Sequence, residues 1–285
     1  MKGFATAPFL FVGSGFSRRY LQLETWSDLL AHFAEMTGKP YAYYVTSADG
    51  DLPRVASALA DTFHDVWWQD ARFADSRDRF GKGALVTREG PLKVEIARHV
   101  DGALTRLPTE GELAQEIELL GEAVIDGVIT TNYDRLLEQV FDDYKVYTGQ
   151  DQVLFSDPQG IGEIYKIHGS ADDPESLVLS AADFTRYRDR NPYLAAKLLT
   201  IFVEHPVLFM GYSLTDANIR EILVSVARCL TSENLPRLQD RLIFINWNPD
   251  AIEATFARSM MSIEGIAIPV ITVETASFAG SSDIR

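Results

Sequence analysis

Two residues of this sequence combine chemically useful side chains with a position just after a short apolar run. Asn132 lies in Thr-Thr-Asn-Tyr-Asp, and His168 lies in Lys-Ile-His-Gly-Ser. An asparagine amide offers both a donor and an acceptor, and a histidine with its ordinary pKa of about 6.5 can act as a base at neutral pH. Isolated residues of these types more often stabilise a fold, so the elements that carry them decide their meaning.

A glycine turn near the start of the chain is a candidate phosphate site. Gly13-Ser14-Gly15 follows the apolar run at 9–12 and precedes a helix predicted to begin near Thr25. Glycines let a backbone approach a pyrophosphate, and the free N–H groups of a following helix favour an anion. The full dinucleotide fingerprint is absent, because position 18 is Arg and not Gly. A plain glycine turn fits these residues equally well.

Polar residues at other strand ends also fit a nucleotide. Gly211 and Ser213 are placed to meet a ribose or phosphate, and Asn246 is placed to meet an adenine. Asp134 and Asp216 each precede an apolar helical pattern and have the plain interpretation of helix N-caps. These motifs are ambiguous when each is taken alone.

The elements that would position these residues follow a regular rhythm. Six short, continuous apolar runs end in Gly, Asn, Ser, Thr or Pro, and they lie within 9–12, 123–131, 162–169, 205–213, 241–249 and 265–274. Continuous runs indicate strands buried on both faces, and helical patterns separate several of them. The sequence therefore predicts an α/β fold with a Rossmann-like, doubly wound parallel sheet of about six strands. Ligands of such sheets bind at the carboxyl ends of the strands, where the polar residues fall.

Residues 40–110 do not follow that rhythm. They hold many aromatic residues and no convincing buried strand, so we predict a mostly helical module inserted into a single domain that spans 1–285. The polar stretch 73–83 is predicted to be a loop. The aromatic residues Tyr43, Trp67 and Trp68 are candidates for a contact surface or for the core of the module itself.

Composition excludes several classes of protein. The net charge of -15 argues against nucleic acid as the main partner, since phosphate binding needs a basic surface. The single cysteine, Cys229, excludes an internal disulfide and a multi-cysteine metal site. No apolar stretch approaches the length of a membrane span. A cytoplasmic protein is expected.

In this order the motifs resemble the sirtuin superfamily, and more closely its prokaryotic, NAD-hydrolysing, antiphage-defence branch than the protein deacylases. The motifs that carry the resemblance are Gly13-Ser14-Gly15-Phe16-Ser17, Thr131-Asn132-Tyr133-Asp134, His168-Gly169, Gly211-Tyr212-Ser213 and Ile245-Asn246. The four-cysteine zinc module of the deacylases cannot be built here. The family's Pro-Asp-Phe-Arg loop is also missing, and Thr131 replaces its glutamine.

The resemblance implies a substrate and a set of site residues. NAD is the implied substrate, without a metal; Asn132 orients a water or the ribose hydroxyls, and His168 acts as the base. The implied NAD-binding residues are Gly13, Ser14, Gly15, Ser17, Arg18, Thr131, Asp134, Gly211, Ser213 and Asn246.

The implied activity is cleavage of the nicotinamide–ribose bond to give nicotinamide and ADP-ribose, with antiphage defence by NAD depletion as its setting. Control by homo-oligomerisation, or by a separately encoded regulatory partner such as an ATPase, is expected, with no direct nucleic-acid or membrane contact. Two alternatives stay open. One is a module that senses NAD or ADP-ribose without turnover, and the other is a protein ADP-ribosyltransferase.

Overall fold

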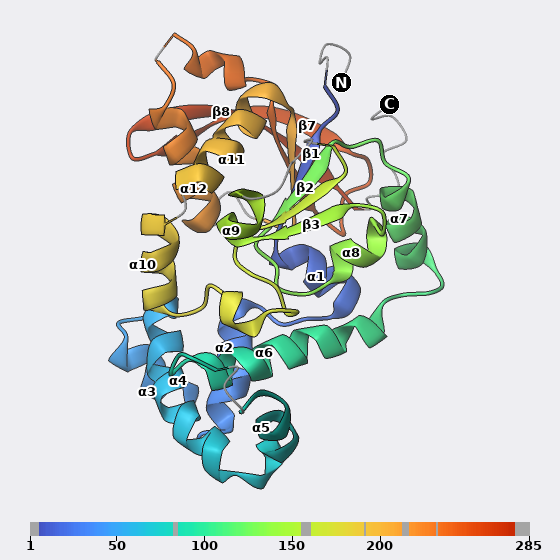
Figure 1. Cartoon of the computed structure of the whole chain (residues 1–285). Helices are drawn as coiled ribbons and strands as arrows, with labels where there is room; N and C mark the ends of the chain where they lie inside the picture. The colour runs from blue at the N-terminus through green and yellow to red at the C-terminus, as the bar shows by residue number, and fades with distance from the viewer. Residues whose placement is uncertain are drawn as a thin grey trace.

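The computed structural model describes residues 6–81, 85–154, 161–190, 192–212, 217–231 and 233–276. Its centre is an eight-stranded sheet with the strand order β3-β4-β2-β1-β5-β6-β8-β7 (Figure 1). The strands are β1 Phe9–Val12, β2 Gly127–Thr130, β3 Lys145–Thr148, β4 Glu163–Lys166, β5 Val207–Met210, β6 Leu242–Trp247, β7 Thr255–Ile263 and β8 Ile266–Thr275. Neighbouring strands are parallel, except that β7 and β8 form an antiparallel pair.

Both faces of the sheet are covered by helices, because successive side chains of a strand point to opposite faces. In β1, Leu10 and Val12 join one buried cluster, and Phe9 and Phe11 join the other. Helices α1 Ser14–Leu21, α7 Glu112–Gly121 and α8 Leu136–Val140 pack on the first cluster, and α9 Gly149–Leu154, α11 Pro192–Glu204 and α12 Ala217–Arg228 pack on the second. The predicted Rossmann-like, doubly wound fold is confirmed.

All six predicted strands are present, and the sequence missed the two outer ones. Strand β3 buries only Tyr147 among its four residues, and β7 is exposed from Thr255 to Met260. Edge strands of this kind lack the continuous apolar run by which buried parallel strands are recognised. The outer strands extend the sheet without changing the order of the inner ones.

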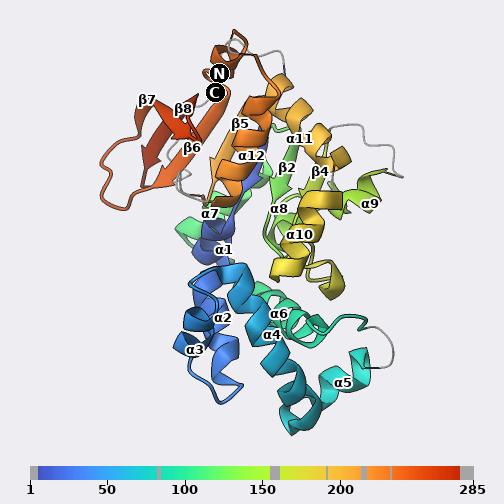
Figure 2. The ribbon, with the colours of Figure 1, turned by 90° about the vertical axis from the view of Figure 1, so that its left-hand side faces the viewer.

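A helical lobe lies below the carboxyl ends of the parallel strands (Figures 1 and 2). It contains α2 Trp26–Glu35, α3 Tyr41–Ser47, α4 Leu52–Gln69, α5 Ala74–Phe80 and α6 Gly90–Gly102. Helix α4 begins where the Asp51 carboxylate accepts a hydrogen bond from the Arg54 amide at 3.0 Å, and it buries a stripe that ends at Trp67. The lobe therefore has its own apolar core, continuous with one face of the sheet.

The structure corrects one expectation for this lobe and decides between two alternatives in another. The described part of the polar stretch 73–83 is mostly helical and not a loop, because α5 occupies residues 74–80; the buried Ser76 hydroxyl accepts a hydrogen bond from Arg98. Trp67 is fully buried, and its Nε1 donates to Glu95 at 2.8 Å, so it belongs to the core. Tyr43 and Trp68 remain exposed.

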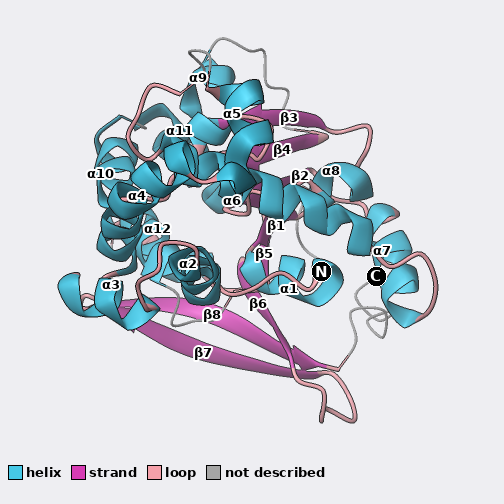
Figure 3. Ribbon diagram, turned by 90° about the horizontal axis from the view of Figure 1, so that it is seen from below, coloured by secondary structure: helices cyan, strands magenta, loops and turns pink. Residues whose placement is uncertain are grey.

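A buried ion pair joins the helical lobe to the second half of the chain. Lys93 of α6 donates to the Asp183 carboxylate of α10 (Ala181–Arg190) at 2.9 Å, and both side chains are buried. The same carboxylate accepts from the amides of Leu179 and Ser180. Because loss of one partner would leave a buried charge uncompensated, this contact holds α10 against the lobe, beside α4 (Figure 3).

Candidate active site

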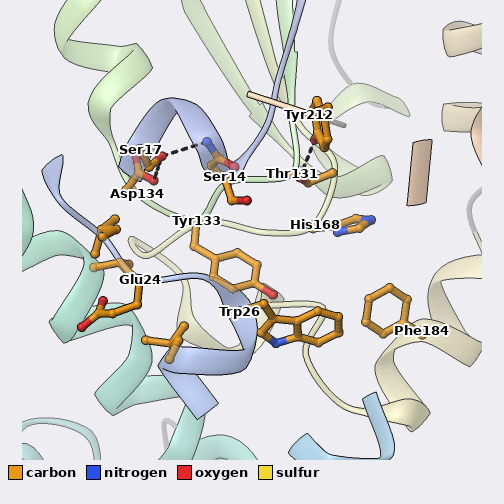
Figure 4. Close-up of a pocket in the computed structure, with 14 residues that line it drawn as sticks. Ser14, Ser17, Glu24, Trp26, Thr131, Tyr133, Asp134, His168, Phe184 and Tyr212 are labelled. Carbon is orange, nitrogen blue, oxygen red and sulfur yellow. Dashed lines mark hydrogen bonds between the residues drawn. The ribbon is translucent and has the colours of Figure 1, made fainter. Parts of the chain in front are cut away.

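A pocket of about 160 Å³ opens where the inner parallel strands end, between the sheet and the helical lobe (Figure 4). The strand ends and α1 supply its upper wall, and α2, α6 and α10 supply the lower one. It is lined by Ser14, Ser17, Leu23, Glu24, Trp26, Leu29, Val100, Thr131, Asn132, Tyr133, Asp134, His168, Phe184 and Tyr212. Residues more than a hundred positions apart in the sequence therefore share one cavity.

The Asn132 side chain is held by a chain of hydrogen bonds. Its Nδ2 donates to the Gly13 carbonyl at 2.9 Å and to the Ser17 hydroxyl at 2.8 Å, and that hydroxyl donates to Asp134 Oδ2 at 2.7 Å. Both amide hydrogens are thus used, which fixes the direction of the side chain. No described residue donates to Asn132 Oδ1, so this oxygen remains as an acceptor at the pocket.

Asp134 serves both the site and the local backbone. Its Oδ1 accepts a hydrogen bond from the Leu136 amide at 3.1 Å at the start of α8. Arg135 and not Asp134 occupies the N-cap position of this helix, so the predicted cap role of Asp134 is wrong by one residue. The buried Lys166 ammonium lies beneath it and donates to the Asp134 carbonyl at 2.6 Å and to Glu138 at 2.7 Å. The segment after β2 that carries Asn132 is therefore held by contacts of Asp134 with the Leu136 amide and with the Lys166 ammonium.

His168 is held quite differently. Its side chain is buried, and its ring meets Phe184 and Tyr187 edge-on, with centroids 5.6 and 5.0 Å away. Burial lowers the pKa of His168 to about 4, because the apolar surroundings disfavour the charged imidazolium. No hydrogen bond from the described residues reaches its ring nitrogens. Packing alone positions a ring that is neutral at pH 7.

The glycine turn is required by the chain's own packing. A Cβ at Gly15 would lie 2.8 Å from the Gly211 carbonyl oxygen, and one at Gly13 would lie 2.6 Å from the Tyr212 ring. The amides of Gly15 and Phe16 donate to Gly211 O and Gly13 O, each at 3.0 Å. Fewer N–H groups are therefore open to a phosphate than the sequence motif predicts.

The helix after the turn begins earlier than the sequence indicates. Helix α1 starts directly at Ser14, which is exposed and lines the pocket. The predicted start near Thr25 belongs to α2, where the Thr25 hydroxyl accepts from the Asp28 amide at 3.2 Å. An anion at the turn would therefore meet α1, and α2 lies across the pocket.

The other predicted residues divide into three groups. Thr131 lines the pocket, and its hydroxyl bonds the Tyr212 hydroxyl at 2.6 Å across the strand ends. Arg18, Gly211 and Asn246 are not among the lining residues. Ser213 and Asp216 lie outside the described residues. Within the described part of the chain, no group of three or more His, Cys, Asp or Glu side chains is arranged to hold a metal ion.

Sequence reasoning missed the lower wall. The Trp26 and Phe184 rings lie tilted to each other with centroids 5.7 Å apart, and the buried Nε1 of Trp26 has no partner among the described residues. Glu24 also lines the pocket, and its carboxylate meets His99 at 3.0 Å. Tyr133 donates to the Val178 carbonyl at 2.7 Å. Spacing alone marks Trp26 and Phe184 as the apolar faces of helices, so it gives no sign that they face a ligand.

A doubly wound sheet with polar groups gathered at its strand ends defines the chain as an α/β protein whose pocket lies at the usual ligand position of such sheets. Residues 126–263 match the family model described as a SIR2-like domain. This match covers the strand ends that carry Asn132 and His168 and leaves out the glycine turn. The resemblance to the sirtuin-like superfamily is confirmed by it and by the relatives described next.

The names of three curated relatives describe them as NAD hydrolases or as a defence-associated sirtuin. The NAD(+) hydrolase ThsA of Enterococcus faecium is 29% identical over 45% of this chain and 28% of its own length. The NAD(+) hydrolase ThsA of Bacillus cereus is 29% identical over 51% of this chain and 31% of its own. Defense-associated sirtuin 2 of Bacillus subtilis is 28% identical over 44% of this chain and 12% of its own. The aligned part spans less than a third of each relative.

None of the helices within the described residues has the length and apolar character that crossing a bilayer requires.

Proposed function

We propose that this chain is an NAD hydrolase that cleaves the nicotinamide–ribose bond and releases nicotinamide and ADP-ribose. The observation that carries the proposal is the open Oδ1 acceptor of Asn132 in the same pocket as the neutral ring of His168. The relatives named NAD(+) hydrolase support it through their similarity to about half of this chain.

The reaction requires little general acid–base catalysis from the protein. Nicotinamide is cationic in NAD and leaves neutral with the electron pair of the broken C1′–N bond, so no general acid is needed. Asn132 Oδ1 would accept a hydrogen bond from the attacking water or from a ribose hydroxyl. His168 would take the water's proton as the C1′–O bond forms. A weak base suffices, because water that adds to an oxocarbenium-like centre becomes strongly acidic.

The pocket suits one end of the dinucleotide. Its 160 Å³ is smaller than the ~300–1,000 Å³ of typical ligand pockets, so it would take the nicotinamide ribose rather than the whole molecule. The Trp26 and Phe184 rings would face the nicotinamide, and the unpaired Trp26 Nε1 would donate to its carboxamide.

We propose that the rest of NAD runs over the glycine turn. Ser14, at the first position of α1, and Thr131 would meet the pyrophosphate, and Ser17 and Asp134 would act by positioning Asn132. The adenosine half would lie towards Gly211, Ser213 and Asn246, with Arg18 at the edge of the site.

The experiment is to incubate the purified chain with NAD and measure free nicotinamide. The proposal predicts nicotinamide and ADP-ribose. Binding of NAD without release would instead favour a sensor module, and adenine label found on protein would favour an ADP-ribosyltransferase.

We further propose antiphage defence by NAD depletion as the setting, in the cytoplasm, since one relative is named a defence-associated sirtuin. Unrestrained NAD loss would harm the host, so assembly with itself or with a partner such as an ATPase would set the rate. Residues 40–110 would act as the contact module, through exposed Tyr43 and Trp68. Equal nicotinamide release per chain by monomer, oligomer and complex would contradict this control.

A further inference from the structure

A second cavity adjoins the candidate active site on the far side of His168. It encloses about 460 Å³ between α10, α11 and α12, a size typical of small-molecule sites. Its lining residues are His168, Phe184, Tyr187, Arg188, Pro192, Ala195, Ala196, Leu198, Leu199, Ile222, Ser225, Val226 and Cys229. His168 and Phe184 line both cavities.

The helix sequences create this space. On α12 the lining residues Ile222, Ser225 and Val226 recur at helical spacing and form one face, and Cys229 directly follows the helix. On α11 the facing wall includes Ala195 and Ala196. Ala195 and Ala196 on α11, and Ser225 on α12, are small side chains among larger apolar ones, and they leave a gap that larger residues would fill.

The lining selects for an uncharged ligand. Leu198, Leu199 and Ile222 give it an apolar floor, and Arg188 is the one residue with a full charge at neutral pH among the described residues that line it. A dinucleotide carries two phosphate charges, for which such walls offer poor compensation. The cavity therefore suits a small aromatic or aliphatic molecule better than the diphosphate half of NAD.

The two cavities are mechanically linked through His168. Phe184 and Tyr187 hold the His168 ring edge-on, and both line the second cavity. Because the ring receives no hydrogen bond from the described residues, a ligand that displaces Phe184 or Tyr187 also displaces His168.

We propose that the cavity between α10, α11 and α12 binds an uncharged, mostly apolar small molecule, and that its occupation moves His168 and slows nicotinamide release. The effect on release rests on the proposed NAD hydrolase activity, whereas the site and the movement of His168 do not.

The test uses N-phenyl-1-naphthylamine, an uncharged dye that brightens in apolar surroundings. The full chain should bind the dye saturably. Ala196 lines the cavity and is exposed, so the tryptophan side chain of Ala196→Trp would occupy part of the cavity and should weaken dye binding by about tenfold or more. Ala196→Ser is the matched control and should bind as the unsubstituted chain does. Bound dye should also slow alkylation of Cys229, the only cysteine of the chain, as followed by mass. Absence of saturable binding, or equal binding by Ala196→Trp, would overturn the site.

The coupling has its own readout. Proton NMR of the histidine rings, with His168 assigned by His168→Gln, should show the His168 signal move as the dye binds. An unmoved signal at saturation would overturn the coupling, as would dye binding that leaves nicotinamide release unchanged. A chain that releases no nicotinamide at all would refute the proposed function, while the dye and NMR measurements would still decide this inference.

Discussion

Asn132 and His168 follow neighbouring strands of one sheet and face one pocket, yet the protein positions them in opposite ways. Asn132 is fixed by directional hydrogen bonds to Gly13 and Ser17, with Asp134 behind them. His168 is fixed by two aromatic rings in an apolar setting. The first arrangement specifies where an acceptor atom points, and the second specifies the charge state of a ring.

This difference suggests a division of labour at the site. A hydrogen-bonded amide keeps its direction when the pocket fills, so it suits the placement of a water or hydroxyl. An imidazole in apolar surroundings stays neutral and can receive a proton only when a strong acid forms beside it. The following predictions test this contrast.

The largest effect is expected for the hydrogen-bonded residue. Asn132→Ala removes the fixed acceptor and should lower nicotinamide release by about 10²–10⁴-fold, as is typical of a single catalytic group. Initial rates at saturating NAD measure the loss, and circular dichroism checks that the variant is folded. A folded Asn132→Ala chain with full activity would end the assignment.

The second prediction concerns the pH dependence of stability. The pKa of His168 is about 4 in the fold, and an unfolded histidine titrates near ~6.5. The unfolded chain therefore binds the extra proton first as pH falls. His168 lowers the unfolding free energy progressively from pH ~6.5 to ~4 and adds no further loss below that range.

Urea unfolding at pH 7 and pH 4 measures this effect. The free energy of unfolding should fall by about 3 kcal/mol more in the unsubstituted chain than in His168→Gln, which cannot titrate. Equal falls in the two proteins would mean that His168 is not held in its neutral form by the fold.

A smaller effect is expected for Ser17, which acts by positioning Asn132. Ser17→Ala removes one of the two bonds that orient the Asn132 amide, while the Gly13 carbonyl keeps the other. We expect kcat to fall about tenfold, the loss of roughly one hydrogen bond to a charged network, with KM little changed. Ser76→Ala alters another buried serine, in the helical lobe, and should leave kcat unchanged. Equal effects of the two would indicate general destabilisation.

The smallest effect is expected from metal removal. The described residues hold no cluster of three metal-ligating side chains, and the chain has one cysteine. Treatment with a chelator should change neither the melting temperature nor the rate of nicotinamide release. Loss of either, with recovery on adding zinc, would require a metal site.

Sequence patterns predicted the inner sheet well, because each buried parallel strand is a continuous apolar run ending in a polar residue. The same logic brought Asn132 and His168 together, since strand ends meet at one edge of the sheet, and both residues line one pocket in the structure. It missed β3, in which only Tyr147 is buried, and β7, whose residues are mostly exposed. It also mistook α5 for a loop, because most of the polar residues of this helix face solvent.

The lower wall of the pocket could not be predicted from sequence. The sequence pattern indicates only that Trp26 and Phe184 are apolar positions of helices. Tertiary packing, including the Lys93–Asp183 ion pair, places their side chains opposite the strand ends. Gly15 was expected to make room for a pyrophosphate, but in the structure it makes room for the Gly211 backbone. A short glycine motif therefore shows that another group packs closely against the backbone, but it does not show whether that group is a ligand or another part of the chain.

The most direct test of the account is a product balance for NAD incubated with the purified chain and, in parallel, with Asn132→Ala. The account predicts equal amounts of nicotinamide and ADP-ribose from the unsubstituted chain and a loss of both, by about 10²–10⁴-fold, in the variant. NAD recovered intact from both incubations, in every assembly state tested, would contradict the central claim.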